Sequence, residues 1–271
     1  MKITSLQNNR VKQLVKLNKR RQRDKLGLMI IEGYRAILRA LDNGFKLKEI
    51  YYCPSVFLGE NEFDLLERAK AEGTELIELS EEVFRKVAYR DRPEGLLALA
   101  PQFRTSLEDI KLGPHTMLVV GEAIEKPGNL GTMLRSADAA GADALVVCDA
   151  CTDIFNPNVV CASIGTIFTV QIAEASSQEF IDWCLNNGVK IIATTPDTTV
   201  NFTDIDLTGP IAIVMGTEQV GLTDTWLKNE KVKKTLITMY GQADSLNVAT
   251  ACTLVLFEAV RQRQNAGILK K

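Results

Sequence analysis

Short apolar runs alternate with amphipathic segments along the first hundred residues of the chain. Apolar runs bounded by Gly or Pro predict strands, and apolar residues at helical spacing predict the helices between them. The expected strands are 27–31, 47–53, 76–79 and 95–100, and the expected helices are 8–25, 32–41, 61–72 and 80–87. This alternation predicts a small α/β domain.

The second half carries more continuous apolar runs, typical of strands buried on both faces of a parallel sheet. The expected strands are 116–120, 144–148, 168–172, 190–194, 211–215 and 235–239, with helices at 129–140, 158–165, 177–187 and from about 245 to 260. This pattern predicts a doubly wound parallel α/β sheet. Residues 106–115, rich in turn formers, are the expected linker between domains at 1–105 and 116–271.

The last expected helix is apolar on nearly every side, which predicts that it is buried. The polar turn before it offers Asp244 or Ser245 as the capping residue. Ser245 and Asn247 stand at the mouth of this helix, where polar groups need partners. A helix cap and a functional site both explain them.

Charge is distributed unevenly along the chain. Residues 1–25 contain nine Lys or Arg and one acid, a net +8, and because the whole chain carries −2 the remainder carries −10. Such clustering favours a polyanion partner over an ordinary solvated helix face. The candidate contacts are Arg10, Lys12, Lys16, Lys19, Arg20, Arg21 and Arg23, with Arg92 from a later polar loop that a structural turn explains equally well.

Several classes of protein are excluded by the cysteines, the single histidine and the lengths of the apolar runs. Cys148 and Cys151 form one C-x-x-C with no second pair, so neither a metal site nor a disulfide is expected. No apolar run approaches the roughly 18–20 residues of a membrane span, and the N-terminus has no secretion signal, so we expect a soluble, cytoplasmic protein. The only histidine, His115, lies in the linker, which argues against a His-centred triad.

Three polar, glycine-bearing loops follow predicted strands, at residues 125–135, 215–222 and 241–251. Ligands bind beyond the carboxyl ends of the strands in doubly wound sheets, so the loops should converge on one pocket. Neither the dinucleotide fingerprint nor a P-loop is present. The polar side chains left for chemistry are Asn129, Arg135, Glu218, Ser245 and Asn247.

Three motifs in these loops occur in a recognisable order. They are Asn129-x-Gly131-x-x-x-Arg135, Gly216-x-Glu218-x-x-Gly221-Leu222 and Ser245-Leu-Asn247-Val-Ala249. Over roughly residues 117–262 they resemble the SpoU/TrmH class of the SPOUT superfamily, RNA ribose 2′-O-methyltransferases that use S-adenosylmethionine. The first half, through Glu32-Gly33-x-Arg35 and the strand 95–100, is similar to the L30e-like substrate-binding domain of rRNA-targeting members.

This resemblance implies a deep trefoil knot in the second domain, dimerisation through the knotted region and a bent cofactor held largely by loop backbone. The implied catalytic set is Arg135, Asn129, Glu218, Ser245 and Asn247. The implied cofactor contacts are Thr195, Met215, Gly216, Gly221, Ile237, Met239 and Leu246. One departure is Glu125-Lys126-Pro127, where the family commonly has Asp-Pro.

Arg135 is too basic to accept the proton of a hydroxyl, because a guanidinium stays protonated. The hypothesis is that Arg135 binds the adjacent phosphate and stabilises the developing alkoxide, while phosphate or water takes the proton. Glu218 could instead serve only the dipole of a helix start, and Asn129 could only cap its own helix. The alternatives are an inactive RNA-binding factor of the same fold, a base-methylating SPOUT enzyme or a tRNA-targeting member; the L30e-like domain favours ribosomal RNA.

Overall fold

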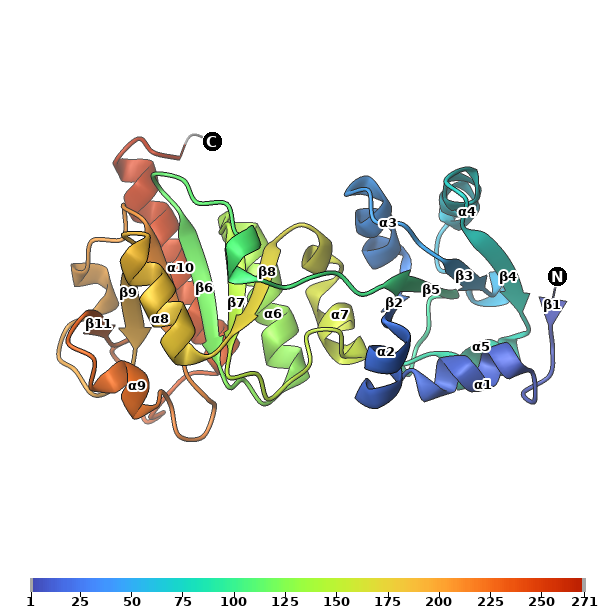
Figure 1. Ribbon diagram of the computed structural model, residues 1–271. Helices are drawn as coiled ribbons and strands as arrows, with labels where there is room; N and C mark the ends of the chain where they lie inside the picture. The colour runs from blue at the N-terminus through green and yellow to red at the C-terminus, as the bar shows by residue number, and fades with distance from the viewer. Residues whose placement is uncertain (1, 270–271) are drawn as a thin grey trace. The chain divides into compact units, whose positions relative to one another are not determined.

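The structure is a computed structural model that describes residues 2–269 (Figure 1). It divides into two compact units. Unit 1 contains the chain up to Phe103 together with Asp153–Thr169, and unit 2 contains Arg104–Thr152 and the chain from Val170 onward. The expected boundary in the linker therefore assigned residues 153–169 to the wrong unit.

Unit 1 is built on a mixed sheet in the order β1-β4-β3-β5-β2, in which β5 runs antiparallel to both of its neighbours. The strands are β1 (Lys2–Ile3), β2 (Leu28–Glu32), β3 (Glu49–Tyr52), β4 (Glu75–Leu79) and β5 (Leu96–Pro101). The helices are α1 (Asn9–Lys16), α2 (Arg20–Leu26), α3 (Tyr34–Asp42), α4 (Glu62–Ala71) and α5 (Glu81–Val87), with a 3-10 turn η1 (Pro54–Val56). The α/β character expected from the alternation is confirmed.

The single helix expected at 8–25 is two helices, α1 and α2. The break between them explains why Arg23 was wrongly predicted to contact RNA. Arg23 fills the break: its guanidinium donates to the carbonyls of Leu17 (2.8 Å) and Asn18 (3.0 Å) and pairs with Asp153. The side chain is only 1% exposed. Arg23 is therefore a buried structural residue and not a surface contact for RNA.

Residues 153–169 pack within unit 1. Helix α7 (Pro157–Ser163) packs against β2, and the 3-10 turn η3 (Thr166–Phe168) packs against α3. Aromatic rings fix both ends of the segment: Phe155 lies 5.0 Å from Phe103 between ring centroids, and Phe168 lies 4.9 Å from Phe45. The strand expected at 168–172 begins later, at Gln171, because the preceding residues form η3.

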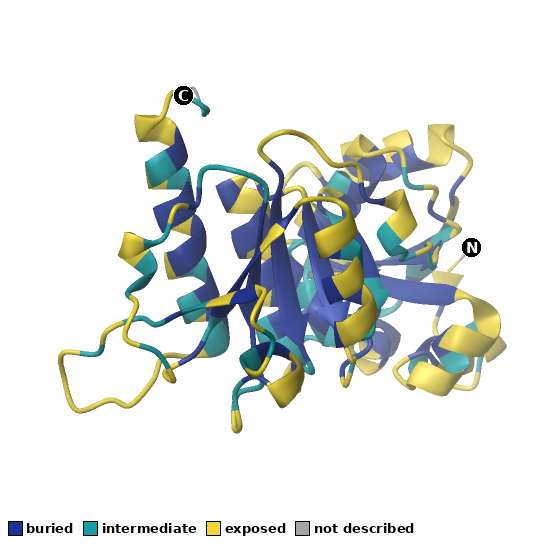
Figure 2. Ribbon diagram, turned by 60° about the vertical axis from the view of Figure 1, so that its left-hand side comes forward, coloured by how far each residue is buried: buried dark blue, intermediate teal, exposed yellow. Residues whose placement is uncertain are grey.

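Unit 2 is a parallel sheet in the order β11-β9-β10-β6-β7-β8, which confirms the expected architecture. Its strands are β6 (Met117–Glu122), β7 (Ala144–Cys148), β8 (Gln171–Ala175), β9 (Lys190–Thr194), β10 (Ile211–Met215) and β11 (Val232–Thr235). Its helices are α6 (Pro127–Ala140), α8 (Ser177–Asn186), α9 (Asp224–Leu227) and α10 (Val248–Asn265), with 3-10 turns η2 (Leu107–Asp109) and η4 (Phe202–Asp204). The central strands are buried on both faces, as Figure 2 shows.

The last strand lies earlier than expected. β11 ends at Thr235, and the apolar residues after it leave the sheet. Leu236 bonds instead to the loop after β9: its N–H donates to the carbonyl of Val200 (2.9 Å), and its carbonyl accepts from the N–H of Phe202 (3.0 Å). The prediction of a strand at 235–239 was wrong because an apolar run does not distinguish a strand from an extended loop that lines a cavity.

The cap of α10 lies two residues after Ser245 and three after Asp244, the two expected caps. The Asn247 carboxamide oxygen accepts from the N–H groups of Ala249 (3.0 Å) and Thr250 (3.4 Å), so Asn247 is the cap, not Asp244 or Ser245. The helix is also not buried all round, because Leu254 and Phe257 are 42% and 46% exposed. No helix within residues 2–269 is long and apolar enough to cross a membrane.

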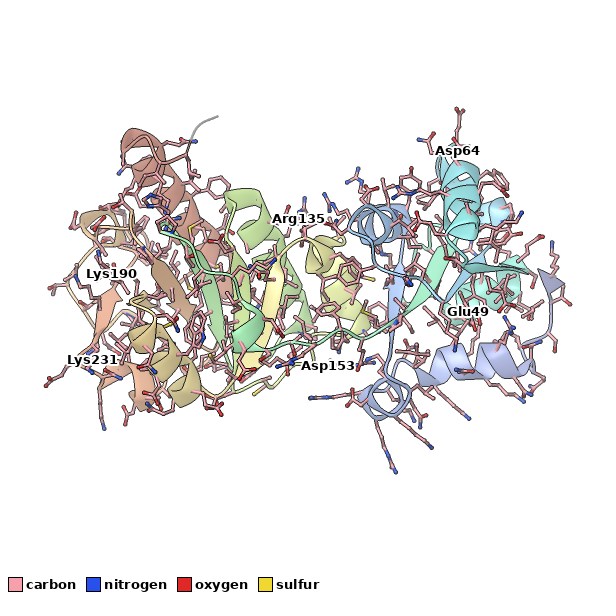
Figure 3. All side chains as sticks on the ribbon, turned by 45° about the horizontal axis from the view of Figure 1, so that its top comes forward. Glu49, Asp64, Arg135, Asp153, Lys190 and Lys231 are labelled. Atoms are coloured by element: carbon pink, nitrogen blue, oxygen red, sulfur yellow. The ribbon has the colours of Figure 1, made fainter. Side chains whose placement is uncertain are left out.

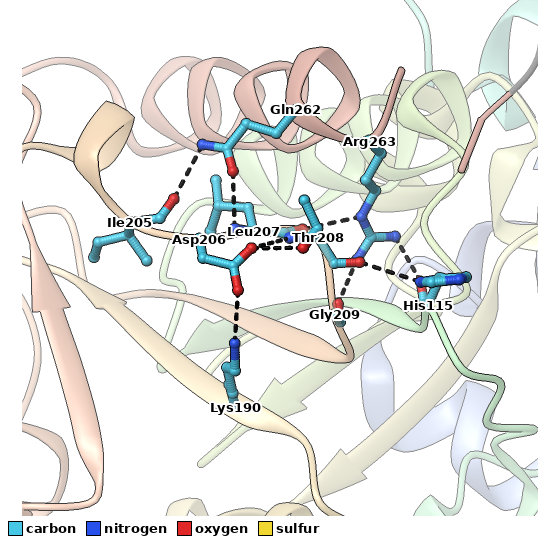
Figure 4. Close-up of polar contacts among 9 residues, drawn as sticks. All are labelled: His115, Lys190, Ile205, Asp206, Leu207, Thr208, Gly209, Gln262 and Arg263. Carbon is cyan, nitrogen blue, oxygen red and sulfur yellow. Dashed lines mark hydrogen bonds and ion pairs between the residues drawn. The ribbon is translucent and has the colours of Figure 1, made fainter. Parts of the chain in front are cut away.

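Arg263, 3% exposed, anchors the far end of α10 (Figure 4). Its guanidinium donates to the carbonyls of Leu207 (3.1 Å), His115 (2.5 Å), Gly209 (2.8 Å) and Thr116 (3.3 Å). Burial lowers the pKa of Arg263. The carbonyls come from the start of β6 and the loop before β10, so one side chain ties α10 to the sheet.

Candidate functional site

A cavity of about 570 Å³ opens at the carboxyl ends of β9 and β10 in unit 2. Its walls come from the ends of these strands and from the segment between β11 and α10. All seven expected cofactor contacts line it: Thr195, Met215, Gly216, Gly221, Ile237, Met239 and Leu246. The volume lies within the range of about 300–1,000 Å³ found for small-molecule sites. Strand-end loops thus meet at the carboxyl edge of the sheet, where the sequence pattern predicted a pocket.

The β10 loop closes on itself so tightly that its first glycine has no room for a side chain. A Cβ on Gly216 would lie 2.4 Å from the backbone carbon of Gly221. The two ends of the turn exchange backbone hydrogen bonds, Thr217 N–H to Gly221 carbonyl (3.0 Å) and the reverse (3.2 Å). Gly221 has φ +72°, which favours glycine. Bare backbone therefore forms this wall of the cavity.

Side chains of the three motifs form one hydrogen-bond chain. The Asn129 amide donates to the Glu218 carboxylate (2.7 Å), and the Asn247 amide donates to the Asn129 oxygen (3.1 Å). The other end of Asn247 caps α10. Residues from α6, the β10 loop and α10 therefore hold one another in place. Their contacts indicate that they position the loops.

The Glu218 carboxylate also accepts from the backbone N–H groups of Glu125 and Lys126, both at 3.3 Å. Partial burial pushes the pKa of Glu218 upward, but the Asn129 and backbone hydrogen bonds outweigh it and hold the pKa below its usual value. The sequence departs from the family pattern at Glu125-Lys126-Pro127, and there the backbone N–H groups of residues 125 and 126 contact Glu218. This contact uses no carboxylate of Glu125.

Ser245 and Arg135 have different surroundings from this chain. Ser245 is exposed, lines the cavity and makes no hydrogen bond among residues 2–269. Arg135, labelled in Figure 3, is exposed on α6 and does not line the cavity. In the described part of the chain its guanidinium has neither an ion pair nor a hydrogen bond. The structure thus brings Glu218, Ser245 and Asn247 to the cavity and leaves Arg135 outside its wall.

The sequence patterns missed two polar residues in the lining. Thr194 ends β9, and its buried hydroxyl has no hydrogen-bond partner, so a polar ligand in the cavity would satisfy it. Asp197 adds a carboxylate to those of Glu218 and Asp244, against the single cation Lys126. Position just after an apolar strand was the signal available for both. The acidic lining suits a ligand that carries positive charge.

The basic cluster of unit 1 is largely exposed, apart from Arg23. Lys12, Lys16, Lys19 and Arg21 are exposed on α1, α2 and the break between them. Arg10 pairs with Glu75 (2.9 Å), and Arg20 lies 3.5 Å from Asp24. Arg92 is exposed in the loop after α5. Four cations of the cluster therefore have no acidic partner among the described residues.

The cysteines are present as thiols, and most of them are buried. All six are free, and no group of three or more potential metal ligands is present among residues 2–269. Burial raises the pKa of the Cys184 and Cys252 thiols to about 12. These two cysteines are packing residues with little thiolate character.

A parallel α/β sheet with three hydrogen-bonded motif loops around a cavity at its strand ends is the arrangement expected of a SPOUT-class methyltransferase domain. Comparison with known families agrees with this class. The chain belongs to the SpoU rRNA methylase family, whose model matches residues 116–257. Residues 8–98 match the MRM3-like substrate-binding domain.

Relatives of similar length share the whole arrangement. The chain is 29% identical to the 23S rRNA (guanosine(2553)-2′-O)-methyltransferase RlmP of Bacillus subtilis, over 94% of this chain and 97% of that protein. A crystal structure of an AdoMet-bound rRNA methyltransferase from Sinorhizobium meliloti superposes with a TM-score of 0.86 at 33% identity, covering 96% and 97% of the two chains. The SpoU methyltransferase AviRb from Streptomyces viridochromogenes, in complex with the cofactor AdoMet, gives a TM-score of 0.85 at 28% identity, covering 95% and 99%.

Proposed function

We propose that this protein transfers a methyl group from S-adenosylmethionine to a ribose 2′-hydroxyl of ribosomal RNA. The observation that carries the proposal is the Glu218–Asn129–Asn247 chain, which locks the three family motifs around one cavity. Similarity to full-length rRNA methyltransferases, one of them AdoMet-bound, supports the substrate and the cofactor. An rRNA substrate also fits the cytoplasmic location expected from the sequence.

The cavity residues suit the proposed cofactor. S-adenosylmethionine supplies a methyl group on a cationic sulfonium, which is already activated for displacement. The acidic side chains of Asp197, Glu218 and Asp244 favour a cation, and the buried Thr194 hydroxyl offers an unpaired polar contact. The missing side chain at Gly216 lets the β10 loop close on itself and so shapes one wall of the cavity. The protein's task is then mainly alignment of donor and acceptor, which lowers the barrier by pre-organisation.

Arg135 is the proposed group for the acceptor side. It binds the phosphate beside the target ribose and stabilises the oxygen as its proton leaves to phosphate or water. The planar guanidinium fork suits a phosphate, and no acidic partner within residues 2–269 neutralises it. Ser245, exposed at the cavity and without a hydrogen bond there, is the proposed polar contact nearest to this chemistry.

A second copy of the chain is the proposed means of completing the site. Arg135 lies outside the cavity wall of its own chain, and α10, which packs on α6, exposes Leu254 and Phe257. A homodimer that covers this apolar face would bring Arg135 to the cavity of the partner. The proposed trefoil knot involves the contacts of Leu236 with Val200 and Phe202, which hold the final segment against the β9 loop.

Methyl incorporation into rRNA tests the proposal. The full-length protein is incubated with radiolabelled S-adenosylmethionine and rRNA from cells that lack the enzyme, and the product is digested to locate a nuclease-resistant 2′-O-methyl dinucleotide. Arg135→Lys should lower turnover by about 10²-fold or more while leaving calorimetric cofactor binding unchanged. Near wild-type turnover would refute the role of Arg135, and absence of cofactor binding in the wild type would favour an inactive RNA-binding factor.

The basic cluster is proposed to attract RNA phosphates without sequence preference. Affinity for rRNA fragments should fall steeply with salt, and a variant with Lys12, Lys16, Lys19 and Arg21 changed to Gln should have a smaller salt slope. Substitution is preferable to deletion, because deletion would remove the buried Leu14, Leu17 and Arg23. A slope unchanged by the substitutions would assign phosphate contact to another surface.

A further inference from the structure

A second cavity, of about 490 Å³, lies within unit 1 and is not lined by residues of the three unit 2 motifs. It is formed where the start of α3 meets the loop before α4 and the loop after α5. Its lining includes Gly33, Tyr34, Arg35, Leu58, Glu62 and Arg90. None of the proposed cofactor or acceptor-side residues lines it, so the chemistry proposed above leaves this cavity unexplained.

Glu62 gives the cavity an acceptor that lacks a partner. The side chain is 5% exposed. One oxygen, Oε1, accepts from the N–H groups of Leu58 (3.2 Å) and Gly59 (2.8 Å) and so fixes the loop before α4. The other oxygen, Oε2, is buried and has no hydrogen-bond partner. A buried carboxylate oxygen without a donor is costly, so this oxygen points to a ligand that donates an N–H or O–H.

One exposed cation lies beside the start of α3 in the same cavity. The helix start itself is already occupied, because the Glu94 carboxylate accepts from the Tyr34 N–H (3.3 Å). Arg35 is exposed and has no ion pair or hydrogen bond among residues 2–269. Arg90, in contrast, is already paired with Glu94. Arg35 is thus the cation available to a phosphate.

Exposed apolar side chains lie in and beside the lining of the same cavity. Leu58, in the cavity lining, is 77% exposed, and the neighbouring Phe63 at the start of α4 is 57% exposed. Tyr34 is half-buried in the same lining. Exposed apolar and aromatic side chains beside a cation are what single-stranded nucleic acid sites use to hold unstacked bases.

We infer that the unit 1 cavity holds one unstacked nucleotide of the RNA substrate, with its phosphate at Arg35 and its base donating to Glu62. The inference rests on the proposed function for RNA as the substrate. Guanine fits the acceptor best, because its Watson–Crick edge places N1–H and the 2-amino group side by side. Uracil has a single N–H between two carbonyl oxygens, which a carboxylate repels. The cavity therefore reads a guanosine away from the methylation site.

Binding selectivity tests the inference with defined RNA probes. Fluorescein-labelled short oligouridines carry one internal guanosine, inosine or no substitution, and their affinity for the full-length protein is measured by anisotropy. The guanosine probe should bind roughly five- to tenfold more tightly than the plain oligouridine. Inosine, which lacks the 2-amino group, should fall between the two. Equal affinity for the three probes would overturn the inference without any variant.

Glu62→Gln is the matching protein change. The glutamine oxygen can still accept from Leu58 and Gly59, so the loop contact is kept, while the amide NH₂ replaces the free acceptor with a donor. The preference for guanosine should disappear and affinity for plain oligouridine should rise. Asp64→Asn on the same helix removes the same charge from an exposed side chain, labelled in Figure 3, and should leave the preference unchanged. A Glu62→Gln protein that keeps the wild-type preference would refute the assignment of Glu62.

Arg35→Gln separates the phosphate contact from base recognition. Affinity for all probes should fall by a similar factor, because phosphate contacts carry no sequence information. Loss of selectivity alone would place Arg35 at the base and overturn the assigned orientation. Methyl incorporation into rRNA distinguishes the two proposals: activity without guanosine preference refutes only the unit 1 site, and a wild-type protein that binds no RNA refutes both.

Discussion

Replacement of Arg263 by Met should strongly destabilise unit 2 although the residue lies far from the cavity. The guanidinium donates to four backbone carbonyls, of which only that of Thr116 keeps another donor, the N–H of Ile211 at 2.9 Å. The other three carbonyls would therefore lose the only hydrogen-bond donor that they have among the described residues. At about 1–1.5 kcal/mol for each such hydrogen bond, the expected loss is about 3–4 kcal/mol. This corresponds to a fall in melting temperature of roughly 10 °C for a unit of this size.

Urea unfolding followed by tryptophan fluorescence measures this loss. Both tryptophans, Trp183 and the fully buried Trp226, belong to unit 2, so the signal reports that unit. Arg261→Met is the matched control, since Arg261 lies on the same helix but is exposed and paired only with Glu258 (2.7 Å). The control should lose less than about 1 kcal/mol. Equal stability of the two variants would refute the idea that Arg263 anchors α10.

Two further predictions concern the cavity loops. Gly216→Ala should lower affinity for S-adenosylmethionine by about tenfold or more in calorimetry, because the new Cβ would meet the backbone of Gly221. The control, Gly128→Ala, has nothing within 4 Å of its new Cβ and should bind the cofactor normally. Normal binding by both variants would show that the turn can open. Glu218 has a lowered folded-state pKa, so its contribution to stability is present above the unfolded pKa of about 4.3 and is lost as pH falls through the lower folded value. Glu218→Gln should therefore flatten the acid side of the unit 2 stability profile, and a profile identical to wild type would refute this.

Local patterns predicted the sheet of unit 2 and the convergence of its loops. Parallel strands buried on both faces have a strong apolar signal, and loops after such strands necessarily meet at one edge. The seven cofactor contacts that the family resemblance implied line one cavity at this edge. The hydrogen bonds that join Glu218, Asn129 and Asn247 were not predictable, because they depend on side-chain directions across residues far apart in sequence.

The errors arose where a distant residue decides a local outcome. The residues around Arg23 have the composition of a surface helix. Arg23 is nevertheless buried, because it forms an ion pair with Asp153, 130 residues later in the chain. Leu236 belongs to an apolar run, but Val200 and Phe202 take up its backbone groups outside the sheet. Asn247 caps α10 in preference to Ser245, because its longer side chain both accepts from the helix start and donates to Asn129.

Because residues 153–169 belong to unit 1, no single cut in the chain separates the two units. The chain passes between the units three times, after Phe103, Thr152 and Thr169. A protease that cuts the 106–115 segment would leave two fragments still joined by the packing of α7 on β2 and by the Arg23–Asp153 pair. A gene fragment ending near residue 105 would encode a unit 1 that lacks α7. The substrate-binding half therefore cannot be transferred intact to another enzyme by a single cut in the gene.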